Sequence, residues 1–127
     1  MRILLIFCCF LAQASAAKEI YGTWRTAEGE DGGYLHVHIE ACGDASCGVI
    51  VHAVDETGQS NPAYEYMKRQ ILFDMVEDGG VWRGRVWAPD SGQTFRAKMI
   101  PSGQTAKLSG CTLGGIICRS QLWTRVD

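Results

Sequence analysis

The sequence contains no hydrophobic run long enough to span a bilayer and no helix-length segment with a helical repeat of apolar residues. Its longest apolar stretch, Ile3 to Ala12, is only about half the length that a membrane-spanning helix requires. Lysine and arginine, 12 in total against 14 acidic residues, form no cluster along the chain. A surface that neutralises nucleic-acid phosphates needs such clusters, so the sequence indicates no nucleic-acid partner.

Signatures of common catalytic sites are also absent. The chain has neither the Gly-x-Ser-x-Gly motif of serine hydrolases nor a phosphate-binding loop. Asp90 falls in a turn sequence, Pro89 to Gly92, and has no partner carboxylate at a spacing specific to an acid–base pair. No cysteines show the Cys-x-x-Cys spacing of thioredoxin-like sites. The sequence therefore predicts no catalytic residue and no cofactor.

The amino terminus has the pattern of an export signal. Arg2 precedes the apolar stretch, and Ala14-Ser15-Ala16-Ala17 is the kind of small-residue sequence that signal peptidases cleave. We therefore expect residues 1–17 to be a signal peptide and residues 18–127 to form a single domain. The mature protein is then periplasmic or secreted, has no transmembrane segment, and resides where disulfide bonds persist.

Four cysteines remain in the predicted mature chain: Cys42, Cys47, Cys111 and Cys118. Four cysteines can pair in three ways. Local pairing, Cys42 with Cys47 and Cys111 with Cys118, is favoured because each pair flanks a glycine-containing turn sequence. A zinc knuckle that uses all four is the alternative, and an oxidising compartment disfavours it.

Short stretches of alternating polarity, separated by Gly, Asp and Ser, fill the rest of the chain and predict an all-β fold. About eight short strands at steady spacing indicate a small antiparallel up-and-down barrel or a sandwich. The expected strands are Tyr21 to Thr26, Tyr34 to Ala41, Gly48 to Val54, Gln70 to Glu77, Val81 to Ala88, Thr94 to Ile100, Thr105 to Gly110 and Ile116 to Val126. In the long central connection, Asn61-Pro62 is a helix-start pattern and predicts one short helix over Ala63 to Arg69.

Several short motifs recur in an order that resembles a known family. They are Gly22-x-Trp24, Cys47-Gly48-x-Ile50-Val51, Trp82-x-Gly84-x-Val86-Trp87-Ala88-Pro89-Asp90-Ser91-Gly92-Gln93-Thr94-Phe95, Leu108-Ser109-Gly110-Cys111 and Gln121-Leu122-Trp123-Thr124-Arg125. Together they resemble the exported bacterial proteins of domain-of-unknown-function family 2147, whose members look like calycins, the lipocalin-related barrels. The resemblance implies a calycin-like barrel and an exported location, and it implies no activity.

In lipocalin-like barrels a tryptophan of the first strand closes one end, and an arginine near the last strand lies over its ring. By this resemblance, Trp24 and Arg125 are expected to form a structural closure pair through a cation–π contact. Gly22 is expected to let the backbone pass close beneath them.

The three histidines are the one group of side chains in the sequence whose pattern indicates metal binding. If the apolar faces of the second and third strands match, His38 lies opposite His52, with His36 two residues away on the same face. Such a set can hold zinc with an open position for water, which makes a metal-dependent hydrolase the alternative function. We favour a solvated face, because the side chains point outward and only Glu40 is near enough to orient them.

The inward face mixes large and small apolar side chains, and this predicts a mostly filled core with a modest pocket near residues 55–69. Tyr64, Tyr66 or Met67 is expected over its opening. The preferred function is non-enzymatic: a monomer that binds a small apolar or amphipathic ligand, or an envelope protein at the barrel rim. A purely structural envelope component is a further alternative.

Overall fold

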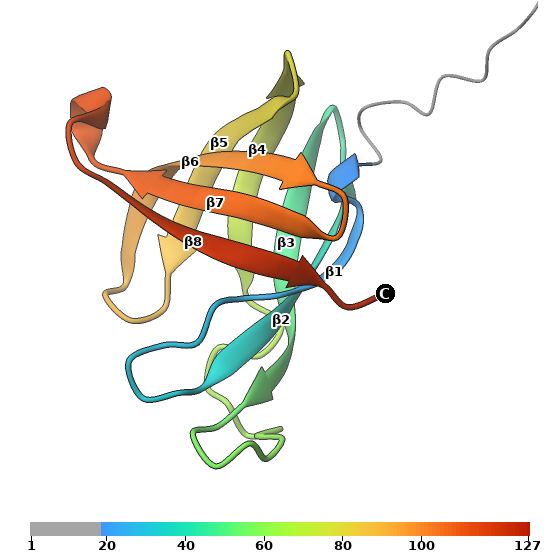
Figure 1. Cartoon of the computed structure of the whole chain (residues 1–127), viewed down its shortest axis with the longest axis vertical. Coiled ribbons are helices and arrows are strands. Elements are labelled where there is room, and N and C mark those ends of the chain that lie inside the picture. The colour runs from blue at the N-terminus through green and yellow to red at the C-terminus, as the bar shows by residue number, and fades with distance from the viewer. Residues whose placement is uncertain (1–18) are drawn as a thin grey trace, which may run out of the picture.

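The computed structural model describes residues 19–127, so the predicted signal peptide, with Cys8 and Cys9, lies outside the described residues. Eight strands form one closed antiparallel barrel, in which each strand pairs with the next and β8 pairs with β1 (Figure 1). The predicted all-β barrel is confirmed. The strands are β1 (Gly22–Arg25), β2 (Tyr34–Cys42), β3 (Ala45–Val54), β4 (Gln70–Asp78), β5 (Val81–Ala88), β6 (Gln93–Ser102), β7 (Thr105–Cys111) and β8 (Cys118–Arg125). No helix within residues 19–127 has the length and apolar character needed to cross a membrane.

The core fills the barrel interior with side chains from alternate strand positions. This alternation is clearest on β2, where Val37 and Ile39 are fully buried between partly exposed histidines. The largest fully buried side chains come from six strands and from the segment before β1: Ile20, Trp24, Val37, Ile39, Ile50, Leu72, Met75, Met99 and Trp123. The hydrophobic effect therefore holds the barrel together from inside.

One end of the barrel is closed by the segment that leads into β1. Ile20 is fully buried there, and its carbonyl accepts a hydrogen bond of 3.0 Å from the indole Nε1 of Trp24. The guanidinium carbon of Arg125 lies 4.3 Å from the centroid of the Trp24 ring. The same guanidinium donates hydrogen bonds of 2.6 Å to the carbonyls of Tyr21 and Glu19. Arg125 thus ties the segment before β1 to the end of β8.

Gly22 lies directly beneath this closure. Its φ of 118° is a conformation that side-chain-bearing residues rarely adopt. A Cβ at Gly22 would also lie 2.8 Å from a guanidinium nitrogen of Arg125 and 2.8 Å from a carboxylate oxygen of Asp127. Glycine is therefore the residue that this close approach requires.

The register between β2 and β3 differs from the prediction. His36 pairs with His52 and Val37 pairs with Ile50, so β3 contains one extra residue at this point, a β-bulge. The predicted pairing of His38 with His52 is therefore wrong: His38 pairs with Val49. From Val37 to the β2–β3 turn the pairing runs without a further shift, and the Cys42–Cys47 bond lies at this turn.

The connection between β3 and β4 contains turns instead of the predicted helix. The amide of Met67 donates to the carbonyl of Tyr64 at 3.1 Å, and the amides of Tyr64 and Arg69 likewise donate to carbonyls three residues earlier, so this stretch forms separate four-residue turns. Lys68 then adopts a positive φ of 68° and pairs with β3, donating from its amide to the carbonyl of Ile50 at 2.8 Å. The amide of Ile50 donates in return to the carbonyl of Arg69 at 3.0 Å. The backbone of residues 68 and 69 therefore forms hydrogen bonds with β3 in place of those within a helix.

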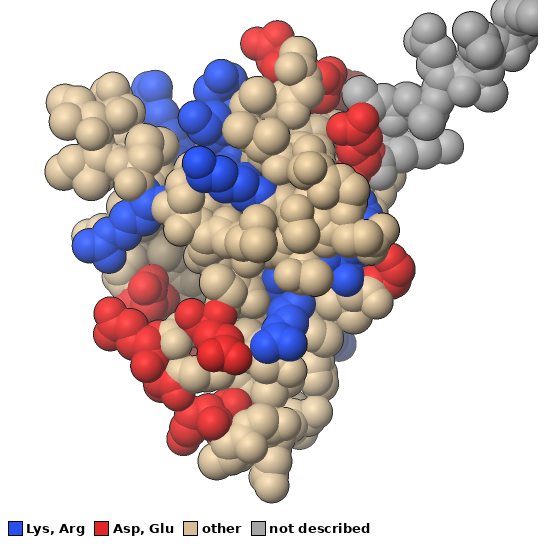
Figure 2. Space-filling view, viewed as in Figure 1, with Lys and Arg blue, Asp and Glu red and all other residues tan. Residues whose placement is uncertain are grey.

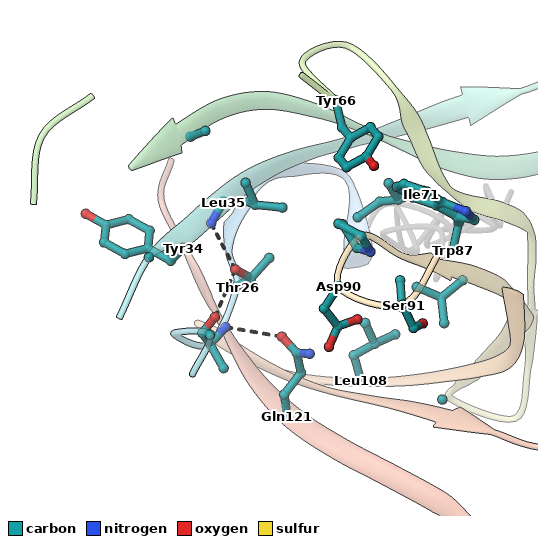
Figure 3. Close-up of a pocket in the computed structure, with 18 of the residues that line it drawn as sticks. Thr26, Tyr34, Leu35, Tyr66, Ile71, Trp87, Asp90, Ser91, Leu108 and Gln121 are labelled. Carbon is teal, nitrogen blue, oxygen red and sulfur yellow. Dashed lines mark hydrogen bonds between the residues drawn. The ribbon is translucent and has the colours of Figure 1, made fainter. Parts of the chain in front are cut away.

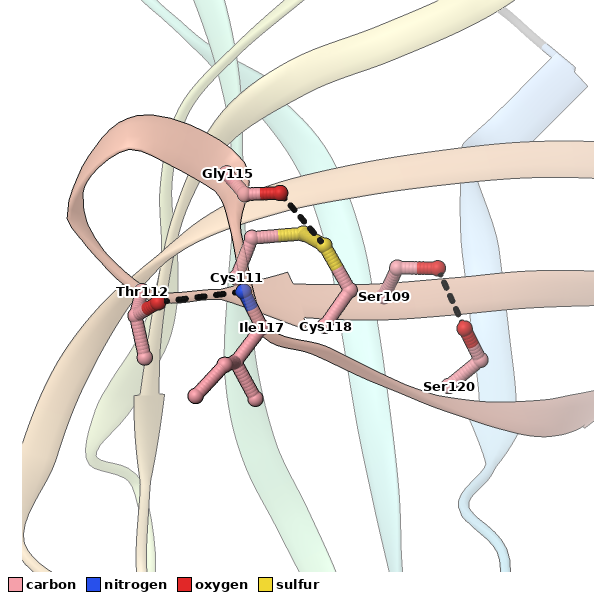
Figure 4. The surroundings of a disulfide bond; sticks show 7 residues. All are labelled: Ser109, Cys111, Thr112, Gly115, Ile117, Cys118 and Ser120. Carbon is pink, nitrogen blue, oxygen red and sulfur yellow. Dashed lines mark hydrogen bonds between the residues drawn. A yellow bond between two sulfur atoms is a disulfide. The ribbon is translucent and has the colours of Figure 1, made fainter.

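Two disulfide bonds join Cys42 to Cys47 and Cys111 to Cys118, which is the expected local pairing. All four cysteines are thereby used, which leaves none for a zinc knuckle. The second bond joins the last residue of β7 to the first residue of β8 and closes the loop over residues 112–117 (Figure 4). Within this loop, the amide of Ile117 donates to the hydroxyl of Thr112 at 3.3 Å.

Candidate functional site

A cavity of about 820 Å³ occupies the end of the barrel opposite the Trp24 closure. Four connections contribute residues to its lining: residues 26–33, 55–69, 89–92 and 112–117. The cavity lies where the pocket was predicted, and Tyr64 and Tyr66 line it, whereas Met67 does not. It is larger than the modest pocket expected, because the connections after β1 and β3 extend its walls beyond the strands.

Apolar side chains from the inner faces of the strands form the floor of this pocket. Trp123 and Leu108 are almost completely buried, and Leu35, which follows the β1–β2 loop, is half-buried. Burial of a ligand's apolar surface against such a floor is favourable by roughly 25 cal/mol per Å². The apolar strand residues that line the pocket are Leu35, Ala53, Val54, Ile71, Val86, Trp87, Ala88, Phe95, Leu108 and Trp123.

Three aromatic rings form one wall of the opening. The ring centroids of Tyr66 and Trp87 lie 4.9 Å apart and those of Tyr64 and Tyr66 lie 5.6 Å apart, both edge-to-face. The guanidinium of Arg69, which does not line the pocket, stacks 3.6 Å from the centroid of Trp87. Burial, followed by nearby Tyr66, Glu65 and Asp90, raises the pKa of Tyr64, so this phenol stays neutral at physiological pH.

The rim of the pocket is acidic. Acidic side chains gather on the face where the β1–β2 loop and the β5–β6 turn lie, whereas Lys and Arg gather nearer the β7–β8 loop (Figure 2). Among the described lining residues, Arg119 is the one Lys or Arg. The hydroxyl of Thr57, then the amide of Gln59, hold the pKa of Asp55 below its usual value. The acidic lining residues are Asp31, Asp55, Glu56, Glu65 and Asp90.

A polar contact fixes the position of the β1–β2 loop against β8. The side-chain Oε1 of Gln121 accepts hydrogen bonds from the indole of Trp123 at 2.8 Å and from the amide of Ala27 at 3.2 Å (Figure 3). In the same loop, the hydroxyl of Thr26 accepts a hydrogen bond of 3.0 Å from the amide of Leu35. These contacts hold the opening in a defined shape.

The sequence identifies Asp90 only as a turn residue and gives no local signal for Glu65. Both line the pocket, and the carboxylate of Asp90 points to the side where Leu108 and Gln121 lie (Figure 3). A signal was available in the strand order. In an up-and-down barrel, alternate connections lie at the same end, so residues 55–69 and 89–92 had to meet there.

The histidines do not form the predicted set. The rings of His36 and His52 lie 5.0 Å apart, whereas Nδ1 of His38 lies 3.0 Å from the hydroxyl of Thr23 and its Nε2 lies 3.8 Å from Glu40. Within residues 19–127 no group of three or more His, Cys, Asp or Glu side chains is arranged to hold a metal ion. The register that motivated a zinc site on these strands is therefore wrong.

Comparisons with known proteins identify the family and support the barrel fold. A family model described as "Uncharacterized protein conserved in bacteria (DUF2147)" matches residues 22–125. A search of curated proteins gave no match. Among solved structures, a Helicobacter pylori protein is similar to this chain, and its title reads "Protein HP1028 from the human pathogen Helicobacter pylori belongs to the lipocalin family". The two share 14% identity and a TM-score of 0.66, and the match covers 85% of this chain and 83% of that one. This likeness shows the fold.

Proposed function

The chain belongs to the bacterial family DUF2147, and from that premise we propose that it is a non-enzymatic binding module whose barrel pocket takes up a small apolar or amphipathic ligand. The observation that carries the proposal is the pocket of about 820 Å³ with its apolar floor. This volume falls within the range of ~300–1,000 Å³ that is typical of small-molecule sites. The lipocalin-family likeness supports the same proposal by analogy of fold.

An apolar fluorescent dye such as ANS tests the proposal, because its emission rises when it enters an apolar pocket. Leu35 lines the pocket near its opening, and Leu35→Trp places a bulky ring there. We expect this variant to weaken dye binding about tenfold or more, since the added ring occupies the ligand's volume. Leu122→Trp is the matched control, because Leu122 is exposed on the outer face of β8 and does not line the pocket.

Circular dichroism and thermal unfolding establish that both variants keep the fold. If the wild-type protein binds no dye, the ligand-binding function is wrong. If the two variants lose dye binding equally, the dye binds elsewhere and the pocket is not the site.

We also propose that the protein is exported. The two disulfide bonds support an oxidising compartment, and residues 1–17 carry the sequence pattern of a signal peptide. Amino-terminal sequencing of the protein from fractionated native cells tests this. A mature chain that begins near residue 18 in the envelope or medium supports export, and an unprocessed chain in the cytoplasm contradicts it.

A further inference from the structure

The charged groups that line the pocket are almost all of one sign, and three of the carboxylates have no partner. Asp31 and Asp55 accept hydrogen bonds from amides of their own loops, at 3.0 Å and 2.9 Å. Glu56, Glu65 and Asp90 form no side-chain hydrogen bond or ion pair within residues 19–127. These three carboxylates are therefore free to meet a charge that a ligand brings.

Two of the free carboxylates lie beside the aromatic wall, although they come from different connections. Glu65 belongs to the β3–β4 connection and Asp90 to the β5–β6 turn. Their charges raise the pKa of Tyr64, after the larger effects of burial and of Tyr66. Both residues line the pocket together with Tyr64 and Tyr66.

The aromatic rings at this end of the barrel already hold cations. Arg69 stacks on Trp87 at 3.6 Å, and Arg25 stacks on Tyr34 at 3.8 Å. The faces of Tyr and Trp rings attract cations, and they are the usual partners of quaternary ammonium groups. A cationic ligand group beside Tyr64 and Tyr66 would meet the same attraction together with the nearby carboxylates.

An anionic group would meet the opposite environment. Arg119 is the one basic side chain among the described lining residues. Arg25 and Arg69 lie near the opening, but they stack on aromatic rings, and Arg25 also pairs with Glu28 at 3.5 Å. Repulsion from the acidic rim therefore disfavours a carboxylate or phosphate head group.

From the apolar floor, the aromatic wall and the free carboxylates together, we infer that the ligand is an amphipathic cation, with an apolar tail in the barrel and an ammonium head at the rim. This inference rests on the proposed function and adds the chemical class of the ligand. The tail contacts the floor at Leu108 and Trp123, and the head lies between Glu65, Asp90 and the tyrosines.

Three probes with the same decyl tail separate the head group from the tail. They are decyltrimethylammonium, decyldimethylamine N-oxide, which is neutral overall and nearly the same shape, and decyl sulfate. Calorimetric titration below the micelle concentration gives each affinity for the full mature protein. We expect the cation to bind about tenfold or more tightly than the N-oxide, and decyl sulfate to bind most weakly. Raising the salt concentration should reduce the difference, because the rim is exposed.

The double substitution Glu65→Gln with Asp90→Asn removes two charges and keeps the shapes of the side chains. Both residues are exposed, so the fold should survive. We expect the preference for the cation over the N-oxide to fall to about threefold or less, with N-oxide affinity unchanged. Asp44→Asn is the control, because Asp44 lies in the β2–β3 turn at the closed end of the barrel.

The outcomes distinguish this inference from the proposed function. If the cation and the N-oxide bind equally well, or decyl sulfate binds best, the cationic ligand is wrong while ligand binding stands. If none of the three probes binds, the proposed function fails as well. If the double variant keeps the full preference for the cation, Glu65 and Asp90 are not its source and the placement of the head group is wrong.

Discussion

The guanidinium of Arg125 serves two purposes at the closed end of the barrel. Its face lies 4.3 Å from the Trp24 ring centroid, and its edge donates to the carbonyls of Tyr21 and Glu19. The contact with the ring and the hydrogen bonds depend on the same planar group, which a lysine cannot reproduce. The stability of this end therefore depends on Trp24 and Arg125 together.

Substitution of the two residues singly and together tests this dependence. Trp24→Ala should lower the free energy of unfolding by about 3–5 kcal/mol, because it empties a large buried volume. Arg125→Ala should cost less, because Arg125 is partly exposed. The free energy of unfolding of the double variant should fall by about 0.5–2 kcal/mol less than the sum of the two single losses. Urea unfolding measures all three variants, and strictly additive losses would show that the contact contributes nothing.

Gly84 on β5 lies under an irregular part of β4. The register between these strands shifts between Phe73 and Val76, and Asp74 there has a positive φ of 53°. A Cβ at Gly84 would clash with the carbonyl of Phe73 and would lie 2.6 Å from the sulfur of Met75. The bulge in β4 leaves room only for glycine.

Gly84→Ala should therefore lower the free energy of unfolding by about 1–3 kcal/mol, the range for overpacked sites. Gly110→Ala is the matched control, because the nearest atoms to its Cβ lie at 3.5 Å and its φ is not positive. That variant should differ from the wild type by about 0.5 kcal/mol or less. A tolerated Gly84→Ala, with unchanged thermal unfolding, would mean that β4 relaxes around the new methyl group.

At the scale of elements, the bulge in β3 brings two imidazoles together. The rings of His36 and His52 lie 5.0 Å apart. Burial, followed by the charges of His52 and Arg25, lowers the pKa of His36 below its ordinary value of 6.5. The folded chain then binds fewer protons than the unfolded chain, so stability is complete above about pH 6.5 and falls as the pH drops through that value.

His36→Gln removes this titration, so thermal unfolding should become less sensitive to acid. We expect the fall in Tm between about pH 7.5 and about pH 5.5 to be smaller in the variant than in the wild type. His38→Gln is the comparison, because it removes an imidazole from the same strand away from His52. An unchanged pH dependence in His36→Gln would contradict the low pKa of His36.

The outer face of β5 and β6 places like charges directly opposite each other. Arg83 pairs with Lys98, and Arg85 pairs with Arg96. Asp74 balances Arg85 through an ion pair of 2.7 Å, whereas no ion pair within residues 19–127 involves Arg83 or Lys98. Like charges directly opposite on neighbouring strands are destabilising.

Lys98→Glu converts the first pair into opposite charges and should raise the free energy of unfolding by about 0.2–1 kcal/mol. Lys107→Glu makes the same change in net charge at a position whose cross-strand partners are Ile100 and Leu122, and it should give no such gain. Urea unfolding at low salt compares them. Equal effects of the two variants would assign the change to net charge, not to the pair.

The strands could be predicted because apolar and polar residues alternate along them. The conformations of the connections could not be predicted, because tertiary contacts determine them. Alternation located all eight strands, and β5 has the predicted bounds. The bulge near His36 left no trace in the apolar pattern, so the register of the histidines was wrong. The sequence Asn61-Pro62 favours a helix locally, but pairing of Lys68 with Ile50 overrides it. The acidic rim is assembled from three connections and appears only when the barrel closes.

At the scale of the whole molecule, the two ends of the barrel differ, and each end has its own disulfide bond. The Cys42–Cys47 bond lies at the closed end, beside the β2–β3 turn. The Cys111–Cys118 bond lies at the open end, where Thr112 in the loop that it closes lines the pocket. The first bond can therefore affect stability alone, whereas the second can affect both stability and ligand binding.

Replacing each pair of cysteines by serine separates these effects. Both bonds close short loops, so each double variant should lose about 2 kcal/mol of stability, measured by urea unfolding. Ligand binding should weaken only without the Cys111–Cys118 bond, because its loop can then move away from the pocket and ordering it opposes binding. ANS titration of the folded variants, below their unfolding transitions, measures this. If loss of the Cys42–Cys47 bond weakens binding equally, the dye responds to general loosening of the barrel. If neither loss weakens it, the loop over residues 112–117 takes no part in holding the ligand.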